Sequence, residues 1–361
     1  MKQKEKNMKL KKILAAAMAS VAMLTTLTAC SENSGTSSTV SNGNNGSSAA
    51  GNNNDSSPAD NNSDPGNGTP DIGDKVFNIG ICQLIQHPAL DDATKGFQDA
   101  LKEKLGDNVK FDVQNANGDS ATCATIVNSF VSGNVDLIMA NATAALAAAV
   151  SATNAIPVVG TSITSYDVAL GDGWTGKNVT GASDLAPIDK QEDMILEIFP
   201  DVKKVGIMYC SAEPNSKYQA DVMKAELEKD NIEYKEYTVT DSNEIQAQTQ
   251  AAIGDGCDVL YIPTDNTFAN AAETVKNVVV PAKVPVVAAE EGICKGCGTV
   301  TLSISYESMG RAAGLMAYDI LVNGKDPGTM AVGYSDTTKM YNPEICSELG
   351  ITIPDGYIAI G

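Results

Sequence analysis

The sequence predicts an α/β protein made of two similar lobes, each built around a parallel β-sheet. The first observation is that short apolar segments alternate with amphipathic helical segments from about residue 76 onward, which is the pattern of parallel strands with crossover helices. The second is that three of the apolar segments recur in the same order later in the chain. The third is length, because residues 72–361 are long for one hydrophobic core and sufficient for two.

The first 29 residues have the composition of an export signal. Lysines crowd the first 12 residues, an uncharged apolar run follows from Ile13 to Thr26, and Leu-Thr-Ala precedes Cys30. The apolar run is shorter than the roughly 18–20 residues that span a bilayer. Leu-Thr-Ala-Cys resembles a bacterial lipobox, which implies that Cys30 carries a lipid anchor with acyl chains such as palmitate. The alternative is an ordinary secretory signal followed by an unrelated cysteine.

Residues 30–71 are predicted to form a disordered tether. They are almost entirely Ser, Gly, Asn, Thr, Asp and Pro, and such a segment buries too little apolar surface to offset the entropy of ordering. A flexible chain of about 40 residues has a typical reach of roughly 35 Å. The sequence therefore predicts a folded part that is held near a membrane but free to move away from it.

The charge of the chain excludes some classes of partner. Without residues 1–29, which hold six lysines and one glutamate, 19 basic and 44 acidic residues remain. A protein this acidic repels nucleic-acid phosphates and anionic lipid headgroups. We therefore expect no nucleic-acid partner, and no later segment is apolar enough for a membrane helix.

The secondary structure of the first half follows from periodicity. Apolar residues at positions 90, 93, 97, 101 and 105 form one face of a helix that begins at Pro88 and ends at Leu105. The remaining predictions for this half are strands at 76–82, 110–114, 135–140 and 157–160, and helices near 120–132 and 143–153.

The same series then begins again. Val205-Gly-Ile207 resembles Ile79-Gly-Ile81, Asp258–Ile262 resembles Asp136–Ala140, and Val284–Val287 resembles Ile156–Val159. The three offsets are 126, 122 and 128 residues, and this near-constant spacing indicates a duplicated lobe.

Candidate ligand contacts follow from the position of the loops. Ligands of parallel sheets bind beyond the carboxyl ends of the strands, where loops lead into helices. The first-lobe loops carry hydroxyls and amides at helix N-termini, which favour an anion, and the second-lobe loops carry carboxylates, which favour a cation. A zwitterion that contacts both lobes meets both charge preferences, with its negative group at the first lobe and its positive group at the second. The candidates from these loops are Gln83, His87, Asn141, Thr143, Thr161 and Ser162 in the first half, and Asn215, Ser216, Thr264, Asp265, Asn266, Glu290 and Glu291 in the second.

Several motifs resemble those of one known family. They are Gly80–Asp91, which contains His-Pro-Ala-Leu-Asp, Asn178–Asp184, Asn215-Ser216, Pro263-Thr-Asp-Asn-Thr267 and Leu349–Pro354. Together they are similar to the substrate-binding lipoproteins of ABC transporters, in the group that includes tryptophan and tyrosine binders. The resemblance covers residues 76–354 and adds Asp91 and Asp184 to the candidate ligand contacts.

The resemblance implies a type I periplasmic-binding-protein fold, with two Rossmann-like lobes joined by a multi-strand hinge that closes on a small solute. It implies a monomer that delivers an aromatic amino acid to an ABC permease. Related branched-chain amino-acid binders hold the ligand ammonium with a Glu-Gly pair that Glu291-Gly292 matches, although the adjacent Glu290 is an equal candidate for facing the cleft. The implied domains are a signal at 1–29, a tether at 30–71, lobe 1 at 72–185 plus 306–335, and lobe 2 at 186–305 plus 336–361, the last segment being open to either lobe.

Simpler interpretations exist for the same residues. His87, Thr143, Ser162, Asp265 and Asn266 are all suited to helix capping. The aromatic residues nearest the loops are candidates for stacking on a ring of the ligand, but each is equally suited to packing in the hydrophobic core. These residues are Tyr166, Tyr209, Tyr218, Phe268 and Tyr306.

The sequence does not favour an enzyme or a cofactor. His87 with Asp91 or Asp92 is the only histidine-containing pair that resembles a catalytic dyad, and no nucleophile signature surrounds it. No glycine-rich turn joins a strand to a helix as in a dinucleotide site. The alternative functions are the same fold with another solute, such as a branched-chain amino acid or a nucleoside, and a surface adhesin.

The cysteines other than Cys30 are expected to be structural. Cys82, Cys123, Cys210 and Cys257 lie in apolar or small-residue contexts that predict burial. Cys294-Lys-Gly-Cys297 suggests a structural disulfide or two free thiols, and a metal site would need two further ligands. No metal is therefore predicted.

Overall fold

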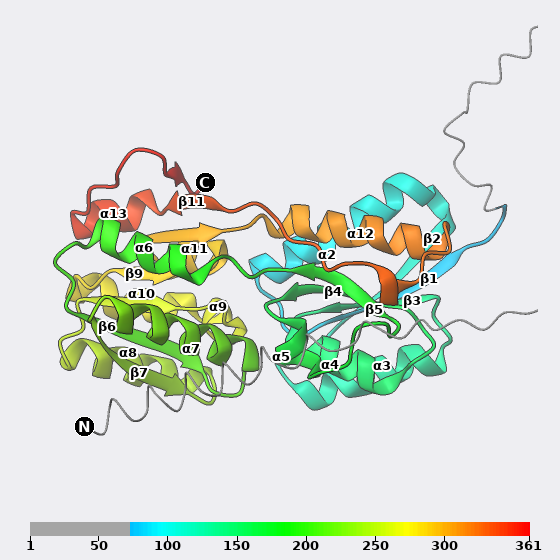
Figure 1. Ribbon diagram of the computed structural model, residues 1–361, viewed down its shortest axis with the longest axis horizontal. Helices are drawn as coiled ribbons and strands as arrows, with labels where there is room; N and C mark the ends of the chain where they lie inside the picture. Colours follow the sequence, from blue (N-terminus) through cyan, green and yellow to red (C-terminus); the bar gives the residue numbers. More distant parts are fainter. Residues whose placement is uncertain (1–72) are drawn as a thin grey trace, which may run out of the picture. The chain divides into compact units, whose positions relative to one another are not determined.

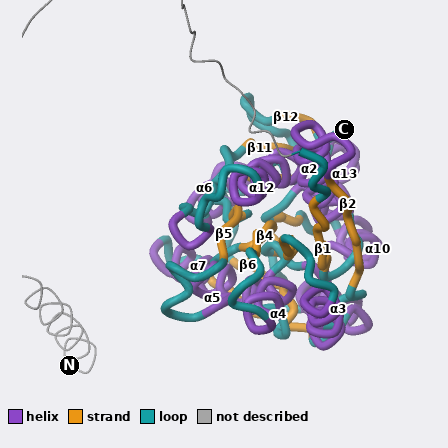
Figure 2. Tube along the Cα trace, turned by 90° about the vertical axis from the view of Figure 1, so that its right-hand side faces the viewer, coloured by secondary structure: helices purple, strands orange, loops and turns teal. Residues whose placement is uncertain are grey.

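The computed structural model describes residues 73–361, which belong to one compact unit that spans Asn67–Gly361. The predicted signal, Cys30 and the tether lie outside the described residues. Within the described unit two sheets form two lobes, and helices cover both faces of each sheet (Figure 1). Figure 2 shows the strands inside and the helices around them. The predicted α/β fold with two similar lobes is confirmed.

The first sheet has five parallel strands in the order β2-β1-β3-β4-β5. Helices α2 and α12 cover one face, and α3 and α4 cover the other (Figure 1). The strands are β1 (Phe77–Gln83), β2 (Val109–Asn115), β3 (Leu137–Asn141), β4 (Val158–Ile163) and β5 (Val179–Ser183), and the helices are α2 (Pro88–Leu105), η1 (Gly106–Asn108), α3 (Ser120–Ser132), α4 (Thr143–Ala152), α5 (Tyr166–Leu170) and α12 (Tyr306–Leu321).

The second sheet has seven strands in the order β12-β11-β10-β9-β8-β6-β7. Its strands are β6 (Lys204–Cys210), β7 (Glu233–Val239), β8 (Val259–Ile262), β9 (Val286–Ala288), β10 (Val300–Ser303), β11 (Thr338–Tyr341) and β12 (Ile358–Ala359). The other elements are α6 (Ile188–Ile198), α7 (Pro214–Lys229), η2 (Ser242–Glu244), α8 (Ile245–Gly254), α9 (Asn266–Asn270), α10 (Ala272–Ala282), α11 (Glu291–Cys297), η3 (Pro327–Thr329) and α13 (Pro343–Leu349).

Two strands at one edge of the second sheet, β11 and β12, depart from the expected parallel pattern, since β12 pairs with β11 in parallel orientation. β11 pairs with β10 in antiparallel orientation, with Val300 opposite Tyr341 and Ser303 opposite Thr338. The reason is the path of the chain: β10 leaves the second lobe toward α12 in the first, whereas β11 returns from the first lobe. Two neighbouring strands on outgoing and returning segments necessarily run in opposite directions.

The lobes are joined by three segments, which follow β5, β10 and η3 (Figure 1). Two of them lie side by side, because Ser183 N–H donates to Gly333 O at 2.8 Å and Gly333 N–H donates to Gly181 O at 2.9 Å. The predicted multi-strand hinge is therefore present. The division of the chain at the predicted residues 185, 305 and 335 remains a prediction.

Local sequence signals account for the best-defined helices. α2 begins at Pro88, ends before Gly106, and buries the predicted apolar face. α3 begins after Asp119, whose carboxylate accepts a hydrogen bond from Thr122 N–H, and it covers the predicted range 120–132. The expected first strand is shifted by one residue, to 77–83.

All seven cysteines among residues 73–361 are buried and free. Cys294 and Cys297 are thus two thiols in the packed core of the second lobe, not a disulfide. Within the same range, no group of His, Cys, Asp and Glu side chains is arranged to hold a metal ion. The described part of the chain also contains no helix of sufficient length and apolarity to cross a membrane.

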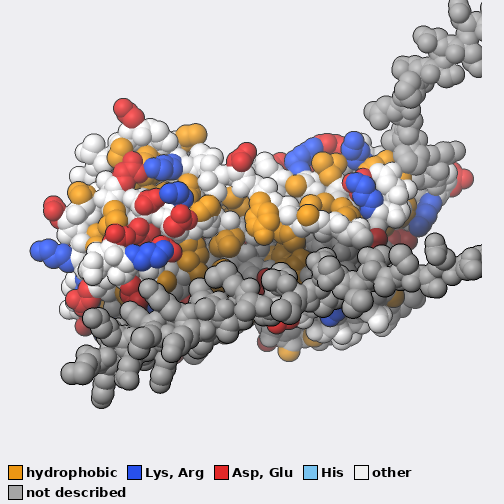
Figure 3. Space-filling model, viewed as in Figure 1, with side chains coloured by type: hydrophobic (Ala, Val, Ile, Leu, Met, Phe, Trp, Pro, Cys, Tyr) orange, Lys and Arg blue, Asp and Glu red, His pale blue; other side chains and the backbone are white. Residues whose placement is uncertain are grey.

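The described surface mixes both signs of charge. Figure 3 shows acidic and basic side chains intermingled over the second lobe, and hydrophobic side chains between these charges and those on the first lobe. Arg311 donates two hydrogen bonds to Glu103, at 2.9 and 2.5 Å, and Lys339 lies 2.6 Å from Glu197. Such exposed pairs contribute little to stability.

Glycines hold α2 and α12 in close contact. A Cβ atom added to Gly310 would lie 2.1 Å from the carbonyl oxygen of Ala93, and one added to Gly96 would lie 2.1 Å from that of Glu307. The two backbones therefore approach more closely than any larger residue permits. The contact matters for the site because His87 precedes α2 and Tyr306 begins α12.

We predict that Gly310→Ala lowers the free energy of unfolding by about 1–3 kcal/mol, because the added methyl group forces the helices apart. Urea unfolding monitored by circular dichroism measures the change. The matched control is Gly254→Ala, since a Cβ there meets no atom within 4 Å, and a helical glycine in open space gains up to ~1 kcal/mol on replacement by alanine. Equal stability of Gly310→Ala and wild type would contradict the close-packing argument.

Candidate functional site

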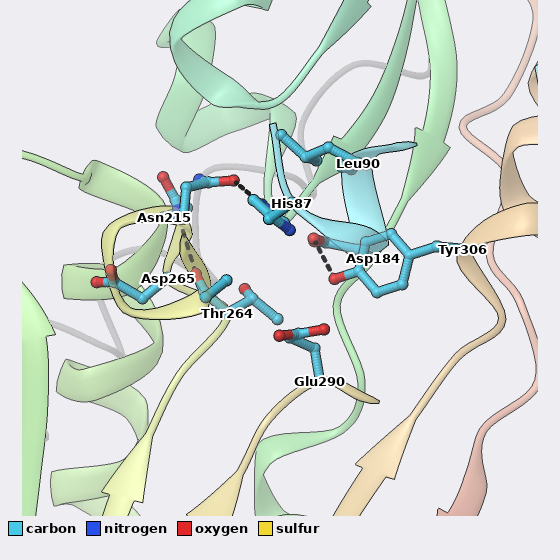
Figure 4. Close-up of a pocket in the computed structure, with 11 residues that line it drawn as sticks. His87, Leu90, Asp184, Asn215, Thr264, Asp265, Glu290 and Tyr306 are labelled. Carbon is cyan, nitrogen blue, oxygen red and sulfur yellow. Dashed lines mark hydrogen bonds between the residues drawn. The ribbon is translucent and has the colours of Figure 1, made fainter. Parts of the chain in front are cut away.

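The carboxyl ends of strands from both sheets face a small cavity between the lobes (Figure 4). Eight of the fifteen predicted contacts line it: His87, Ser162, Asp184, Asn215, Thr264, Asp265, Asn266 and Glu290. The other lining residues are Leu90, Ala269 and Tyr306.

His87 links the two lobes across the cavity. It is the residue before α2, but its side chain makes no capping hydrogen bond. The buried ring instead places Nε2 3.1 Å from Asn266 Oδ1 in the second lobe, and its Nδ1 has no hydrogen-bond partner. Burial lowers the pKa of His87, so the ring is neutral at pH 7.

Ser162 lies on the first-lobe side of the cavity, in the left-handed region with φ of 56°. This conformation accompanies a register shift between β4 and β5. Its hydroxyl donates to Asn141 Oδ1 at 2.8 Å. Ser162 thus connects the cavity wall to polar groups beneath it.

Gln83 and Asn141, which are buried, and Asp91, which is half-buried, belong to one hydrogen-bonded chain behind the cavity wall. Asn141 Nδ2 donates to Leu90 O at 2.8 Å and to Thr94 Oγ1 at 3.0 Å. The Thr94 hydroxyl donates to Gln83 Oε1 at 2.6 Å, and Gln83 Nε2 donates to Asp91 Oδ1 at 2.7 Å. These side chains hold the start of α2, directly after His87, and they do not line the cavity.

Asp184 lies where the chain leaves β5 for the second lobe. Its two oxygens accept hydrogen bonds from Thr164 Oγ1 and from the Tyr306 hydroxyl, both at 3.1 Å. Burial nevertheless raises the pKa of Asp184 to about 6, because the hydrogen bonds do not offset the loss of water. Figure 4 shows the carboxylate and Tyr306 side by side at the cavity.

The second lobe contributes two carboxylates that cap helices. Glu290 accepts hydrogen bonds from the backbone N–H groups of Gly292, at 2.6 Å, and Ile293, and burial raises its pKa to about 7. Asp265 accepts from Cys210 N–H at 2.6 Å and from Phe268 N–H at 2.9 Å. In Figure 4 the carboxylate of Asp265 points away from the cavity and that of Glu290 faces it.

The structure separates the two adjacent glutamates. Glu291 does not line the cavity; it lies in a neighbouring groove with Asp92, Lys295 and Glu307. Its backbone N–H donates to Ser303 Oγ at 3.1 Å. Glu290 is therefore the cavity residue of the pair, a choice that the sequence left open.

The remaining predicted contacts are buried near the cavity without lining it. Ser216 Oγ donates to Thr264 O at 3.2 Å, and Asn215, which does line the cavity, donates to the same oxygen at 2.9 Å. Thr161 is fully buried, with an Oγ1 that has no hydrogen-bond partner. Thr143 is buried as the first residue of α4.

Sequence reasoning missed Glu213 as a site residue, although it falls in the loop 211–216 after β6. It accepts hydrogen bonds from the backbone N–H and side chain of both Asn266 and Thr267. Of the five aromatic residues near the predicted loops, Tyr306 both lines the cavity and packs in a hydrophobic core, and Tyr166, Tyr209 and Phe268 pack in hydrophobic cores without lining the cavity. The role of Glu213 and the positions of the aromatic side chains both depend on contacts between segments that are far apart in the sequence.

The cavity is acidic. The carboxyl groups of Asp184 and Glu290 face it, the third acidic lining residue, Asp265, turns its carboxylate away, and the lining includes no lysine or arginine. Carboxylates buried without a cation are costly unless a bound group supplies the charge. The arrangement therefore suits a solute that carries a positive charge and hydrogen-bond donors.

We predict that Asp184→Asn raises the stability of the ligand-free protein at pH 8. With a folded-state pKa of about 6 and an unfolded value near 3.9, the folded state binds more protons between these values, so stability falls as pH rises through this interval and stays reduced above it. Asparagine removes this cost, which is up to about 3 kcal/mol for a shift of about two pKa units, since both hydroxyl partners can reorient.

Urea unfolding of ligand-free protein at pH 5 and pH 8 measures this effect, with the exposed Asp172→Asn as control. A destabilisation by Asp184→Asn that is equal at the two pH values would contradict a buried, ionised Asp184.

Comparison with known proteins shows the family. Residues 78–359 match the model of the ABC transporter substrate binding protein family. A tyrosine-binding protein of Clostridioides difficile (strain R20291) is 38% identical over 269 residues, which cover 73% of this chain and 77% of that protein.

Two solved structures extend the comparison. An ABC domain from Streptococcus pneumonia in complex with L-Trp is 33% identical, with a TM-score of 0.75, and covers 79% of this chain and 100% of its own. A ligand-free, open substrate binding protein with adhesive properties from Clostridium difficile is 36% identical, with a TM-score of 0.62. The match covers 79% of this chain and 99% of that protein's chain. The two-lobe fold, the interlobe cavity and the family match agree: the chain belongs to the ABC transporter substrate-binding proteins.

Proposed function

We propose that this chain is the extracytoplasmic receptor of an ABC importer and binds an aromatic amino acid, tyrosine, tryptophan or phenylalanine, between its lobes. The observation that carries the proposal is the acidic interlobe cavity without a lysine or arginine among its lining residues. The ligands named for two relatives, tyrosine and L-Trp, support the aromatic class.

The head group of the amino acid pairs with both sides of the cavity. Asp184 and Glu290 are the acceptors for the ammonium group, because they are buried without a basic partner in the lining. The carboxylate group lies against the first lobe, where the N-terminus of α2 offers backbone N–H donors. Leu90, Ala269 and Tyr306 supply apolar surface for the ring.

The described lobes adopt a closed arrangement. Three hydrogen-bond contacts join them: His87 with Asn266 at 3.1 Å, Thr164 with Thr264 at 3.2 Å, and Gln219 with Thr164 at 3.1 Å. The higher TM-score to the Trp complex than to the open structure, at similar identity and coverage, supports the same conclusion. Ligand binding then favours closure to the extent that the closed form binds more tightly.

The finer assignments belong to the same proposal. The domains are residues 1–29 as signal, 30–71 as tether, and lobes divided at 185, 305 and 335, with Cys30 as the lipid-anchored residue. The receptor acts as a monomer, requires no cofactor and performs no catalysis.

We predict that calorimetry on residues 67–361, after unfolding and refolding to remove bound solute, detects micromolar or tighter binding of aromatic amino acids. This corresponds to a binding free energy of about −8 kcal/mol or more negative. Leucine, valine and nucleosides serve as comparison ligands. The ligand is expected back unchanged when chromatography follows the titration. Binding of a nucleoside alone, or turnover of the amino acid, would contradict the proposal.

We predict that Glu290→Gln weakens amino-acid binding at least roughly tenfold, since it removes a carboxylate from the ammonium group. The neighbouring Glu291→Gln is the control and should bind like wild type, because Glu291 lies outside the cavity. Wild-type affinity should fall as pH drops from 8 to 5, because protonation of Glu290 and Asp184, with pKa values of about 7 and 6, removes the negative charges that attract the ammonium. Equal affinities of both variants would reject this head-group model.

We predict that Cys30→Ala moves the full-length protein from the membrane fraction to the soluble extracytoplasmic fraction in a bacterium that processes lipoproteins. The reason is that the sulfur of Cys30 is the proposed site of acylation. Metabolic labelling with a palmitate analogue, followed by fractionation, provides the measurement. Labelling of the variant at wild-type levels would place the anchor elsewhere.

A further inference from the structure

Glu213, Asn266 and His87 form a hydrogen-bonded relay that runs from the second lobe to the first. Glu213 Oε2 accepts from Asn266 Nδ2 at 2.6 Å, and Asn266 Oδ1 lies 3.1 Å from His87 Nε2. His87 and Asn266 line the cavity, and Glu213 is buried behind them. Only the contact between His87 and Asn266 crosses the lobes and is lost when they separate, because Glu213 and Asn266 both belong to the second lobe and remain hydrogen-bonded to each other.

The chemistry of the relay fixes the orientation of the Asn266 amide. A carboxylate only accepts hydrogen bonds, and Glu213 accepts them from Asn266 N, Asn266 Nδ2, Thr267 N and Thr267 Oγ1 at 2.6–3.0 Å. A rotated amide would set its oxygen against the Glu213 carboxylate. The Asn266 nitrogen therefore faces Glu213, and its oxygen faces His87.

The amide orientation in turn selects the tautomer of His87. An amide oxygen can only accept, so His87 Nε2 must carry the proton and donate it. Neutral imidazole has one donor and one acceptor, which leaves Nδ1 as an acceptor. That Nδ1 atom is buried and has no partner, and its residue lines the cavity together with Asp184 and Glu290.

We propose that Glu213 and Asn266 are positioning residues that, on lobe closure, hold His87 in the Nε2-protonated tautomer, so that Nδ1 accepts a hydrogen bond from the ammonium group of the ligand. This rests on the proposed function, because it assigns a role to residues of the same site. A buried acceptor without a donor destabilises the closed form, and a ligand N–H group removes that cost. Closure thus depends on a ligand that brings a donor to this position.

The chain contains a single histidine, so its imidazole signals need no assignment. Long-range ¹H–¹⁵N correlation spectra of ¹⁵N-labelled residues 67–361, with saturating L-tryptophan at pH 7.5, distinguish a protonated from an unprotonated ring nitrogen. We expect Nε2 protonated and Nδ1 unprotonated in the complex. The Nδ1-protonated tautomer or an imidazolium would overturn the proposal.

Variants test the relay itself. Asn266→Ala should give mixed tautomers and bind L-tryptophan roughly fivefold or more weakly, and Glu213→Gln should also mix the tautomers because the Asn266 amide can then rotate. The exposed Asn270→Ala, on the same helix, should match wild type in both readouts. An unchanged tautomer and affinity in Asn266→Ala would overturn the proposal.

Calorimetry on the same samples separates the two hypotheses. Absence of binding by every aromatic amino acid would contradict the proposed function and, with it, the role of the relay. Tight binding with the other tautomer would contradict the relay alone and leave the receptor function intact.

Discussion

Asp184 and Glu290 place two carboxyl groups in a closed cavity with no lysine or arginine among the residues that line it. Burial raises the pKa of both groups, to about 6 and about 7, which shows that their hydrogen bonds do not replace water in full. The closed arrangement therefore buries carboxyl groups that no basic side chain of the lining neutralises, and the ammonium group of the proposed ligand would supply the missing positive charge. This constraint connects solute recognition to lobe closure, since only closure removes these groups from water.

The architecture brings the charged groups together from segments far apart in the chain. Asp184 lies at one of the segments that join the lobes, and Tyr306, which donates to it, begins α12 directly after another. α12 in turn packs against α2 through glycines whose replacement would bring atoms into collision. A hydrogen bond at the cavity thus depends on close helix packing in the first lobe, because α2 and α12 both point their N-termini at the site.

Helix capping and ligand recognition share the same side chains. Glu290 accepts hydrogen bonds from the N-terminal N–H groups of α11 while it faces the cavity, and Asp265 uses its carboxylate for α9 and for Cys210. Capping holds each carboxylate in one rotamer, which lowers the entropy lost when a ligand binds. Burial removes water from these carboxylates, which is unfavourable, and the hydrogen bonds from backbone N–H groups offset part of that loss.

Local patterns in the sequence were sufficient for the elements and for their duplication. The apolar periodicity of 88–105, with Pro88 at its start and Gly106 after its end, determined α2, and the spacing of three apolar segments determined that two similar sheets follow each other. The position of His87, Asp265, Asn266 and Glu290 directly after predicted strands also predicted that they lie near one another. These signals are local, because helix and strand formation depend mainly on neighbouring residues.

Tertiary structure alone decided the direction of the side chains and the cross-lobe contacts. Asp265 and Glu290 both follow a strand and precede a short helix, yet one carboxylate turns into its lobe and the other into the cavity. Glu213 and His87 lie on different lobes and are connected only through Asn266, 179 residues after His87 in the chain. Sequence pattern specifies which residues stand at the ends of strands; which of them meet is set by how the two lobes pack, which no local periodicity encodes.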